Sequence, residues 1–338
     1  ILDEVKYELD WMLQMQDTES GGVYHKITGE KFPDAVMPEE ETAQMYLAPI
    51  STTATADFAA TMAMASRVFK DDAAAQVYLD AAKKAWVYLE ATPGDGVGFK
   101  NPGSIVTGEY DDTNDTDERY WALAELYKTT GDETYLNAMK EYSADKIGTG
   151  LGWQNVGLYG MYAYLTSGSS DDYYDSVKVQ FDQAVDAAYA NAQADAYGVA
   201  LGSSDYTWGS NMNVANNGML FLMANRLEAN PDYVKAANAQ VDYLMGTNTN
   251  SYCFITGFGT LSPVSPHHRP SQSVGQTMSG MLIGGPDANL EDPYAKATLT
   301  DKAPAACYVD NVQSYSCNEV TIYWNSPLVY LLAGIEAE

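Results

Sequence analysis

The feature that most constrains the fold is a series of alanine-rich amphipathic stretches along the chain. In the first, residues 3–16, Val5, Leu9 and Met12 recur at the spacing of one helix face. Similar stretches follow at 53–68, 72–91, 117–129, 132–145, 171–194, 213–228, 231–245 and 326–335. Turn signals such as TPGDGVG at 92–98 separate them, and strand-like alternation is scarce. The sequence therefore predicts an all-α fold.

Short and long links alternate between these stretches, which favours helical hairpins packed side by side. No repeat period is visible in residue identity, which disfavours a solenoid of near-identical units. Hairpins that close into a barrel fit better, and we expect one domain over 1–338. The segment 246–324 differs, because it is rich in Gly, Pro, Ser and Asn and lacks periodicity. Loops longer than ~15 residues are unusual in compact domains, so we expect this segment to build a site.

The charge balance limits the possible partners. The chain has 18 Lys and Arg against 46 Asp and Glu, a formal net charge of −28 spread along its length. Such a charge repels phosphate backbones and anionic lipid headgroups, so neither nucleic acid nor a membrane surface is expected as a partner. No stretch reaches the ~20 apolar residues of a membrane-spanning helix. The 26 Tyr and 6 Trp could stack on sugars or simply line packing surfaces.

Two short segments of the chain carry residues suited to catalysis. Residues 254–270, FITGFGTLSPVSPHHRP, end in two histidines and an arginine. If the backbone is extended there, His267 and Arg269 point the same way and can reach one ligand together. One of the two histidines could equally brace the loop.

The second segment, YVDNVQSYSCNEVTIYWNSP at 308–327, places Asp310 and Glu319 among aromatic and apolar neighbours. Burial raises the pKa of a carboxyl group and keeps it protonated, so Glu319 is the candidate general acid.

These two segments resemble the two active-site signatures of the family 9 glycoside hydrolases. The resemblance extends over nearly the whole chain, and the subgroup with an N-terminal immunoglobulin-like domain is the most similar. It is carried by GGVYHKITGEKFP at 21–33, VMPEEETAQMY at 36–46, STTATADFAATMA at 51–63, NPGSIVTGEYDDTNDTDERYWALAELY at 101–127, WGSN at 208–211 and NNGML at 216–220.

The resemblance implies an (α/α)6 barrel, a toroid of helical hairpins, that hydrolyses internal β-1,4-glucosidic bonds of cellulose or related β-glucans with inversion. Glu319 would be the general acid, and Asp310 and His267 would occupy the other two catalytic signature positions. The implied substrate-binding residues are His25, Arg269, Trp153, Trp208 and Tyr323.

The family's catalytic base is an Asp in a DAGDY-like motif, and no such motif occurs in the chain. We therefore expect the base and the first helices of the barrel to lie upstream of Ile1, by truncation, processing or placement in another polypeptide. An inverting hydrolase needs a second carboxylate about 6.5–9.5 Å from the acid. The chain by itself is thus expected to be nearly inactive. A non-catalytic β-glucan-binding chain that keeps the cleft is the alternative, whereas another (α/α)6 enzyme would not explain both signatures.

The acidic stretch DDTNDTDER at 111–119 resembles a calcium loop of the family. The resemblance implies a structural calcium held by Thr113, Asn114, Asp117, Glu118 and Asn155. Oxygen donors suit calcium, although first-turn carboxylates could also simply face the helix dipole. PDANLEDP at 286–293 is a weaker calcium candidate.

Cys307 and Cys317 could form a bridge or remain two reduced thiols. A polymeric substrate and the resemblance imply a secreted protein, free or on a multi-enzyme scaffold.

Overall fold

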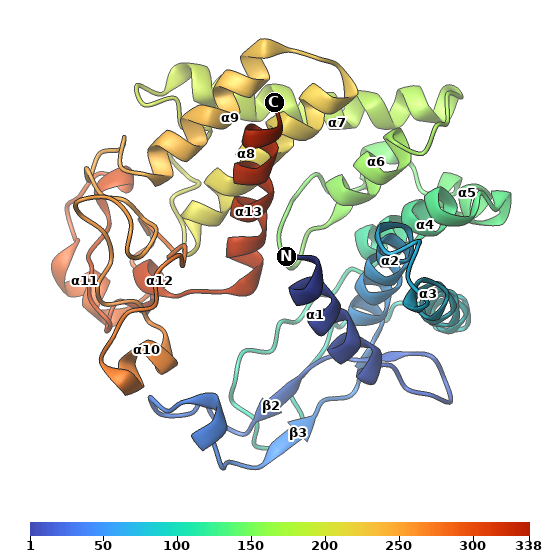
Figure 1. The fold of residues 1–338 in the computed structure, drawn as a ribbon, viewed down its shortest axis with the longest axis horizontal. Helices are drawn as coiled ribbons and strands as arrows, with labels where there is room; N and C mark the ends of the chain where they lie inside the picture. The colour runs from blue at the N-terminus through green and yellow to red at the C-terminus, as the bar shows by residue number, and fades with distance from the viewer. The chain divides into compact units, whose positions relative to one another are not determined.

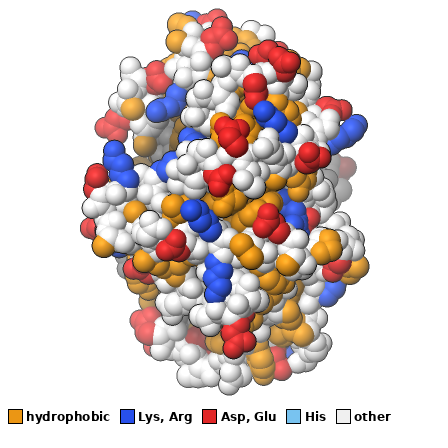
Figure 2. Space-filling view, turned by 90° about the vertical axis from the view of Figure 1, so that its right-hand side faces the viewer, with side chains coloured by type: hydrophobic (Ala, Val, Ile, Leu, Met, Phe, Trp, Pro, Cys, Tyr) orange, Lys and Arg blue, Asp and Glu red, His pale blue; other side chains and the backbone are white.

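The computed structural model describes residues 1–338, which form two compact units (Figure 1). Unit 1 comprises residues 1–33 and 42–181, and unit 2 comprises residues 34–41 and 182–338. Both are mostly helical. None of the helices combines the length and the apolarity that crossing a bilayer requires. On the face shown in Figure 2, acidic and basic side chains are interspersed among neutral ones.

Unit 1 is built around one alanine-rich helix, α2, which packs against both α3 and α4. Five of its alanines are fully or almost fully buried, and these small side chains let the neighbouring helices approach closely. Ser51 caps α2 by accepting the amide hydrogen of Ala54. The helices of this part of the chain are α1 (Leu2–Gln14), α2 (Thr52–Val68), α3 (Ala74–Ala91), α4 (Thr116–Thr130), α5 (Glu133–Lys140), η2 (Ala144–Lys146), α6 (Gly157–Leu165) and the start of α7 (Asp172–Ala194).

Two short antiparallel ribbons carry the chain from α1 to α2. Strand β1 (Val23–Tyr24) pairs with β4 (Ile50–Ser51), and β2 (Ile27–Gly29) pairs with β3 (Met45–Leu47). The first ribbon therefore places His25, which follows β1, beside the N-terminus of α2.

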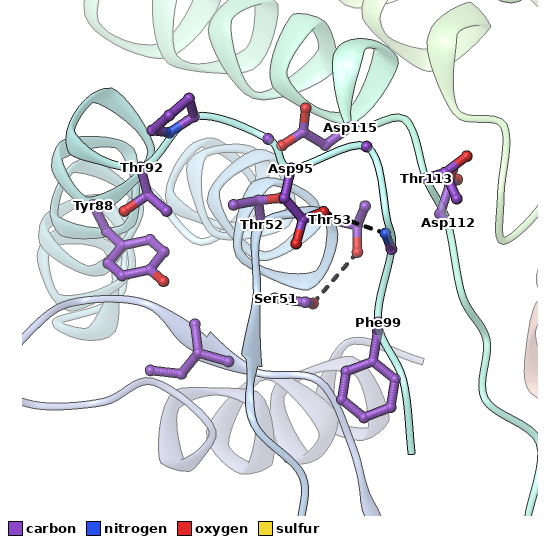
Figure 3. A pocket seen from close by; sticks show the side chains of 15 residues that line it. Ser51, Thr52, Thr53, Tyr88, Thr92, Asp95, Phe99, Asp112, Thr113 and Asp115 are labelled. Carbon is purple, nitrogen blue, oxygen red and sulfur yellow. Dashed lines mark hydrogen bonds between the residues drawn. The ribbon is translucent and has the colours of Figure 1, made fainter. Parts of the chain in front are cut away.

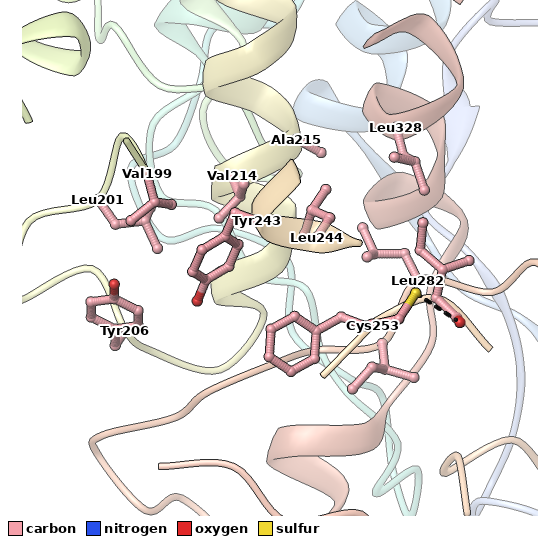
Figure 4. Packing of buried hydrophobic residues seen from close by; sticks show 13 residues of the cluster. Val199, Leu201, Tyr206, Val214, Ala215, Tyr243, Leu244, Cys253, Leu282 and Leu328 are labelled. Atoms are coloured by element: carbon pink, nitrogen blue, oxygen red, sulfur yellow. Dashed lines mark hydrogen bonds between the residues drawn. The ribbon is translucent and has the colours of Figure 1, made fainter. Parts of the chain in front are cut away.

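Unit 2 packs helix α8 against α9 and α13. Its helices are η1 (Pro38–Glu40), the end of α7, α8 (Ser210–Leu227), α9 (Pro231–Leu244), α10 (Arg269–Val274), α11 (Pro293–Thr298), η3 (Pro304–Ala306), α12 (Tyr315–Asn318) and α13 (Ile322–Ala337). A buried cluster that includes Val214, Tyr243 and Leu328 joins these helices to Phe254 and Leu282 of the irregular segment (Figure 4). The irregular segment is thus anchored on the helical core.

The helical stretches predicted from the sequence are all present, with three differences. Helix α5 ends at Lys140, and a short 3₁₀ turn replaces the rest of the predicted stretch. Helix α13 begins at Ile322 because Thr321 caps it, and Pro327 lies inside it. Helix α6 was not predicted, because GLYGMYAYL contains two glycines and is buried on nearly all sides, so it shows no amphipathic period. Segment 246–324 is irregular as expected, apart from short helices, and its cysteines are free and buried.

Candidate functional site

Glu319 lies in unit 2, between the end of α12 and the start of α13. Its amide nitrogen donates to the Tyr315 carbonyl oxygen (2.9 Å), and its own carbonyl oxygen accepts from Gly284 (3.0 Å). The side chain is half-buried. Burial raises the pKa of the carboxyl group, against the opposing effects of Trp208, His267 and Arg269. Glu319 therefore has the environment expected of a general acid.

The HisHisArg segment runs beside Glu319 in unit 2. His267 forms a parallel bridge with Glu319, and its amide nitrogen donates to the Asn318 carbonyl oxygen at 2.8 Å. Its Nδ1 lies 3.1 Å from the Val312 carbonyl oxygen, which can only accept, so Nδ1 carries a proton and Nε2 is left for a ligand. The backbone is extended at His268. The charges of His267 and Arg269 both favour the ionised form of the Glu319 carboxyl group.

His268 has a structural part in the loop. Its side chain caps α10 and its Nδ1 lies 2.8 Å from Ser271 Oγ. Of the two histidines, His268 is thus the one that braces the loop.

Asp310 is engaged with the loop that precedes His267. It accepts the amide hydrogens of Val264 and Ser265, each at 2.9 Å, and the Tyr252 hydroxyl at 3.0 Å. These bonds occupy both carboxylate oxygens. The contacts give Asp310 a part in fixing the loop that carries His267.

Two aromatic residues predicted to contact substrate also lie in unit 2. Trp208 precedes α8, is 38% exposed, and packs its ring against Tyr315 with a centroid distance of 5.4 Å. Its indole N–H donates to Glu319 Oε2 at 2.9 Å. Tyr323, in the first turn of α13, is half-buried and meets Trp324 edge-on.

The loop 286–293, considered above as a second calcium loop, uses its buried carboxylates internally. Asp287 accepts the amide hydrogens of Asn289 and Glu291. Asp292 caps α11 through the Ala295 amide and binds the 314–316 turn. These bonds account for the buried acids without a metal ion.

Unit 1 contains two cavities beside the N-terminus of α2. The larger, of about 300 Å³, is lined mainly by hydroxyl and carboxyl side chains, among them Ser51, Thr53 and Asp95 (Figure 3). The smaller, of about 180 Å³, is lined by His25, Lys26, Thr53, Ala54, Asp57, Tyr110, Asp112, Glu118 and Trp153. Thr53 and Asp112 line both cavities.

His25 and Trp153, predicted to bind substrate, both line the smaller cavity. His25 stacks on Phe99, and its Nε2–H donates to the Glu109 carbonyl oxygen while Nδ1 accepts from Ser51 Oγ. Burial lowers its pKa and keeps the ring neutral. Trp153 meets Tyr110 edge-on at 5.4 Å, and both rings are substantially exposed, as a sugar-stacking platform requires.

The proposed calcium residues lie around the first turn of α4. Asp117 and Glu118 are buried there, whereas Thr113, Asn114 and Asn155 are exposed. Asp117 Oδ2 accepts the Val156 amide hydrogen at 2.8 Å, and the Asn155 carbonyl oxygen accepts from Gly152. No group of three or more His, Cys, Asp or Glu side chains is placed to hold a metal ion. The predicted set contains only two carboxylates and relies on other oxygens for the rest.

Several buried carboxylate oxygens near α4 lack a hydrogen-bond partner. They are Glu118 Oε2, Asp112 Oδ2 and Asp57 Oδ1. Burial first, and then the neighbouring carboxylates, raise the pKa of Asp57 and of Glu118. An oxygen-rich and partly unsatisfied cluster of this kind fits a hard cation such as calcium, whose charge would favour the ionised carboxylates.

Sequence reasoning missed Asp57 and Tyr110 in the smaller cavity. Asp57 was detectable as the single acid within the alanine-rich stretch 53–68. Tyr110 has a positive φ of 55°, which is unusual for an aromatic residue and which the sequence does not signal.

Comparison with known proteins gives consistent matches along the chain. The sequence model described as "Glycosyl hydrolase family 9" matches residues 1–332. Endoglucanase D of Acetivibrio thermocellus is 36% identical over 98% of this chain and 52% of its own length. A xyloglucan-specific endo-beta-1,4-glucanase of Bacteroides ovatus is 37% identical over 100% of the chain and 60% of its own length. The chain thus spans less than two thirds of these curated relatives.

Solved structures give the same result for the fold. A single mutant of a thermostable endoglucanase from Alicyclobacillus acidocaldarius matches with a TM-score of 0.93 and 38% identity, over 97% of this chain and 63% of that one. Such endoglucanases have the (α/α)6 barrel fold, so the predicted fold class is confirmed.

Proposed function

Because the chain belongs to glycosyl hydrolase family 9, we propose that it supplies the general acid and much of the substrate cleft of an inverting endo-β-1,4-glucanase. The observation that carries the proposal is the half-buried Glu319, whose pKa is raised by burial and which lies beside His267 and Arg269. Hydrolysis of β-1,4-glucans as a class agrees with the relatives named above.

The proposed reaction needs a general acid for the leaving group and an activated water for the attack. Glu319 protonates the leaving glycosidic oxygen while water attacks the anomeric carbon from the opposite face, activated by a second carboxylate. Nε2 of His267 and the Arg269 guanidinium are suited to hydrogen bonds with sugar hydroxyls, and Trp153, Trp208 and Tyr323 offer ring faces.

The test is release of reducing sugar from carboxymethylcellulose. It compares the 338-residue chain with the protein extended to the start of its gene's reading frame. We expect hydrolysis with inverted anomeric configuration, observed by NMR of the first product, in the extended protein and little in the chain. Binding of glucan without hydrolysis by both forms would instead support the non-catalytic alternative, and a retained configuration would contradict the proposed mechanism.

We also propose a structural calcium ion at the start of α4, held by Asp117 and Glu118 with oxygens of Thr113, Asn114 and Asn155. The unpartnered and buried Glu118 Oε2 supports it. When bound, the ion would neutralise the acidic cluster and tie the 113–118 turn to the 152–156 turn.

Calcium is expected to raise the melting temperature of the chain. A ligand at 100 times its dissociation constant stabilises the folded state by about 2.7 kcal/mol. The measurement is thermal unfolding with calcium and with a chelator, for the unmodified chain, Glu118→Gln and Glu133→Gln. Glu133 also lies in a helix first turn but is exposed. We expect Glu133→Gln to keep the calcium response and Glu118→Gln to lose it; equal responses in all three would contradict this site.

The localisation and partners follow from the substrate. A cellulose-like polymer lies outside cells, so we propose that the protein is secreted and works either free or on a multi-enzyme scaffold.

A further inference from the structure

The indole of Trp208 contacts the candidate acid through its polar edge. Its N–H donates to Glu319 Oε2 at 2.9 Å, within unit 2. Two contacts fix the tryptophan: its ring packs on Tyr315 and its amide nitrogen donates to Glu291 Oε2. The following Gly209 has a φ of +83°, and a Cβ at that position would lie 3.0 Å from Trp324, so the backbone path beside Trp208 is also restricted. The indole is therefore held in place before substrate arrives.

We propose that Trp208 is a positioning residue for proton transfer: its N–H holds Glu319 Oε2 as the accepting oxygen and leaves Oε1 to carry the proton. The inference rests on the proposed function of Glu319. It follows from the donor chemistry, because an indole N–H can only donate and a carboxylic acid accepts better through its carbonyl oxygen than through its hydroxyl.

The same bond assists the transfer itself. The O–H bond at Oε1 breaks and the proton goes to the glycosidic oxygen. The bond from that oxygen to the anomeric carbon breaks with its electron pair left on the oxygen. Water supplies the new hydroxyl, and its other proton goes to the second carboxylate. Glu319 ends as a carboxylate, to which a hydrogen bond is stronger than to the neutral acid. The Trp208 bond therefore strengthens as the proton leaves.

Other charged groups near this carboxyl group bear on its titration. His267 on the preceding loop and Arg269 at the start of α10 both favour the carboxylate, whereas burial opposes it. Glu291 lies on the far side of Trp208, at its amide nitrogen. Trp208 is neutral, so its substitution removes a direct hydrogen bond to Glu319 and leaves the local net charge unchanged, which allows the contribution of this bond to be measured.

The first test follows the six tryptophan indole N–H signals of the ¹⁵N-labelled chain by NMR as pH is varied. Trp208→Phe assigns the Trp208 signal. We expect this signal to shift with the ionisation of Glu319 and to stop titrating in Glu319→Gln. A Trp208 signal that does not respond to pH, or that responds equally in Glu319→Gln, would overturn the proposal. If Trp208→Phe folds poorly, an indole signal that titrates in the unmodified chain and not in Glu319→Gln still reports the contact, because Trp208 is the tryptophan bonded to Glu319.

The second test measures the pH midpoint of Glu319 by ¹³C NMR of chain labelled at the glutamate carboxyl carbons, with Glu319→Gln for assignment. Loss of a charge-assisted hydrogen bond is expected to raise the midpoint by about one pH unit in Trp208→Phe. Trp11→Phe is the matched control, because it removes an exposed indole on α1 that is not among the proposed site residues, and its midpoint should equal that of the unmodified chain. Equal midpoints in all three proteins would contradict the positioning role and leave Trp208 only as a ring that stacks on sugar.

Neither measurement needs glucan or turnover. A chain without hydrolytic activity can therefore still confirm or refute the contact, which separates failure of this inference from failure of the proposed function.

Discussion

Replacement of Glu319 by Gln is expected to lower kcat on β-glucan by about 10³-fold, because general acid catalysis contributes typically 10²–10⁴-fold. Gln has nearly the same size and keeps a carbonyl oxygen for the Trp208 N–H, but it has no acidic proton for the leaving oxygen. KM and glucan binding should change little, since the rings proposed to bind sugar are untouched. The measurement is initial-rate kinetics on carboxymethylcellulose in the extended protein.

The pH profile of activity tests the role of Glu319 as the acid in a second way. The acid must be protonated, and burial raises its pKa, so activity should persist above the ordinary Glu value of about 4.3 and fall as pH rises through the raised value. Glu336→Gln, an exposed glutamate on α13, is the control and should leave both rate and profile unchanged. Full activity in Glu319→Gln would show that another group is the acid.

The sequence predicted the fold because its main signal is local. Alanine-rich helices such as α2 and α9 can be predicted from their helical hydrophobic period and from their N-cap residues, here Ser51 and Asn230. Helix α6 was not predicted, because a helix that is apolar on nearly all sides shows no amphipathic period in its sequence. The irregular segment could be recognised as a site-builder from its length, but its path depends on anchors such as Phe254 in the unit 2 core.

The candidate site was predictable where residues lie in short signatures and unpredictable where they meet across the sequence. His267, Arg269 and Glu319 come from two segments, and the structure brings them together. The bond between Trp208 and Glu319 spans 111 residues and changes the interpretation of Trp208 from a ring face to a donor. Asp57 joins the cluster at α4 only because α2 packs on α4. Contacts of this kind are determined by tertiary packing, and no short stretch of the sequence predicts them.

The buried Asp292 is expected to show the largest stability effect of any acid in unit 2. It is fully buried and accepts from the Ala295 amide at 2.7 Å and from the hydroxyls of Ser314 and Ser316 at 2.9 and 2.7 Å. Asp292→Ala leaves these donors without their acceptor, which should lower the free energy of unfolding by about 3 kcal/mol. Denaturant unfolding measures this, with exposed Asp301→Asn as the control.

Asp292→Asn separates the charge from the packing. The hydrogen bonds lower the pKa of Asp292 against the effect of burial, so its ionised form stabilises the fold above the ordinary value of about 3.9 and loses that effect as pH falls through the lowered pKa. The stability gap between the unmodified chain and Asp292→Asn should therefore be widest near neutral pH and narrow in acid. A gap independent of pH would mean that shape, rather than the carboxylate, holds the 314–316 turn. The 314–316 turn begins α12, and Glu319 follows the end of that helix, so a gap that depends on pH would make Asp292 the anchor on which the position of the acid depends.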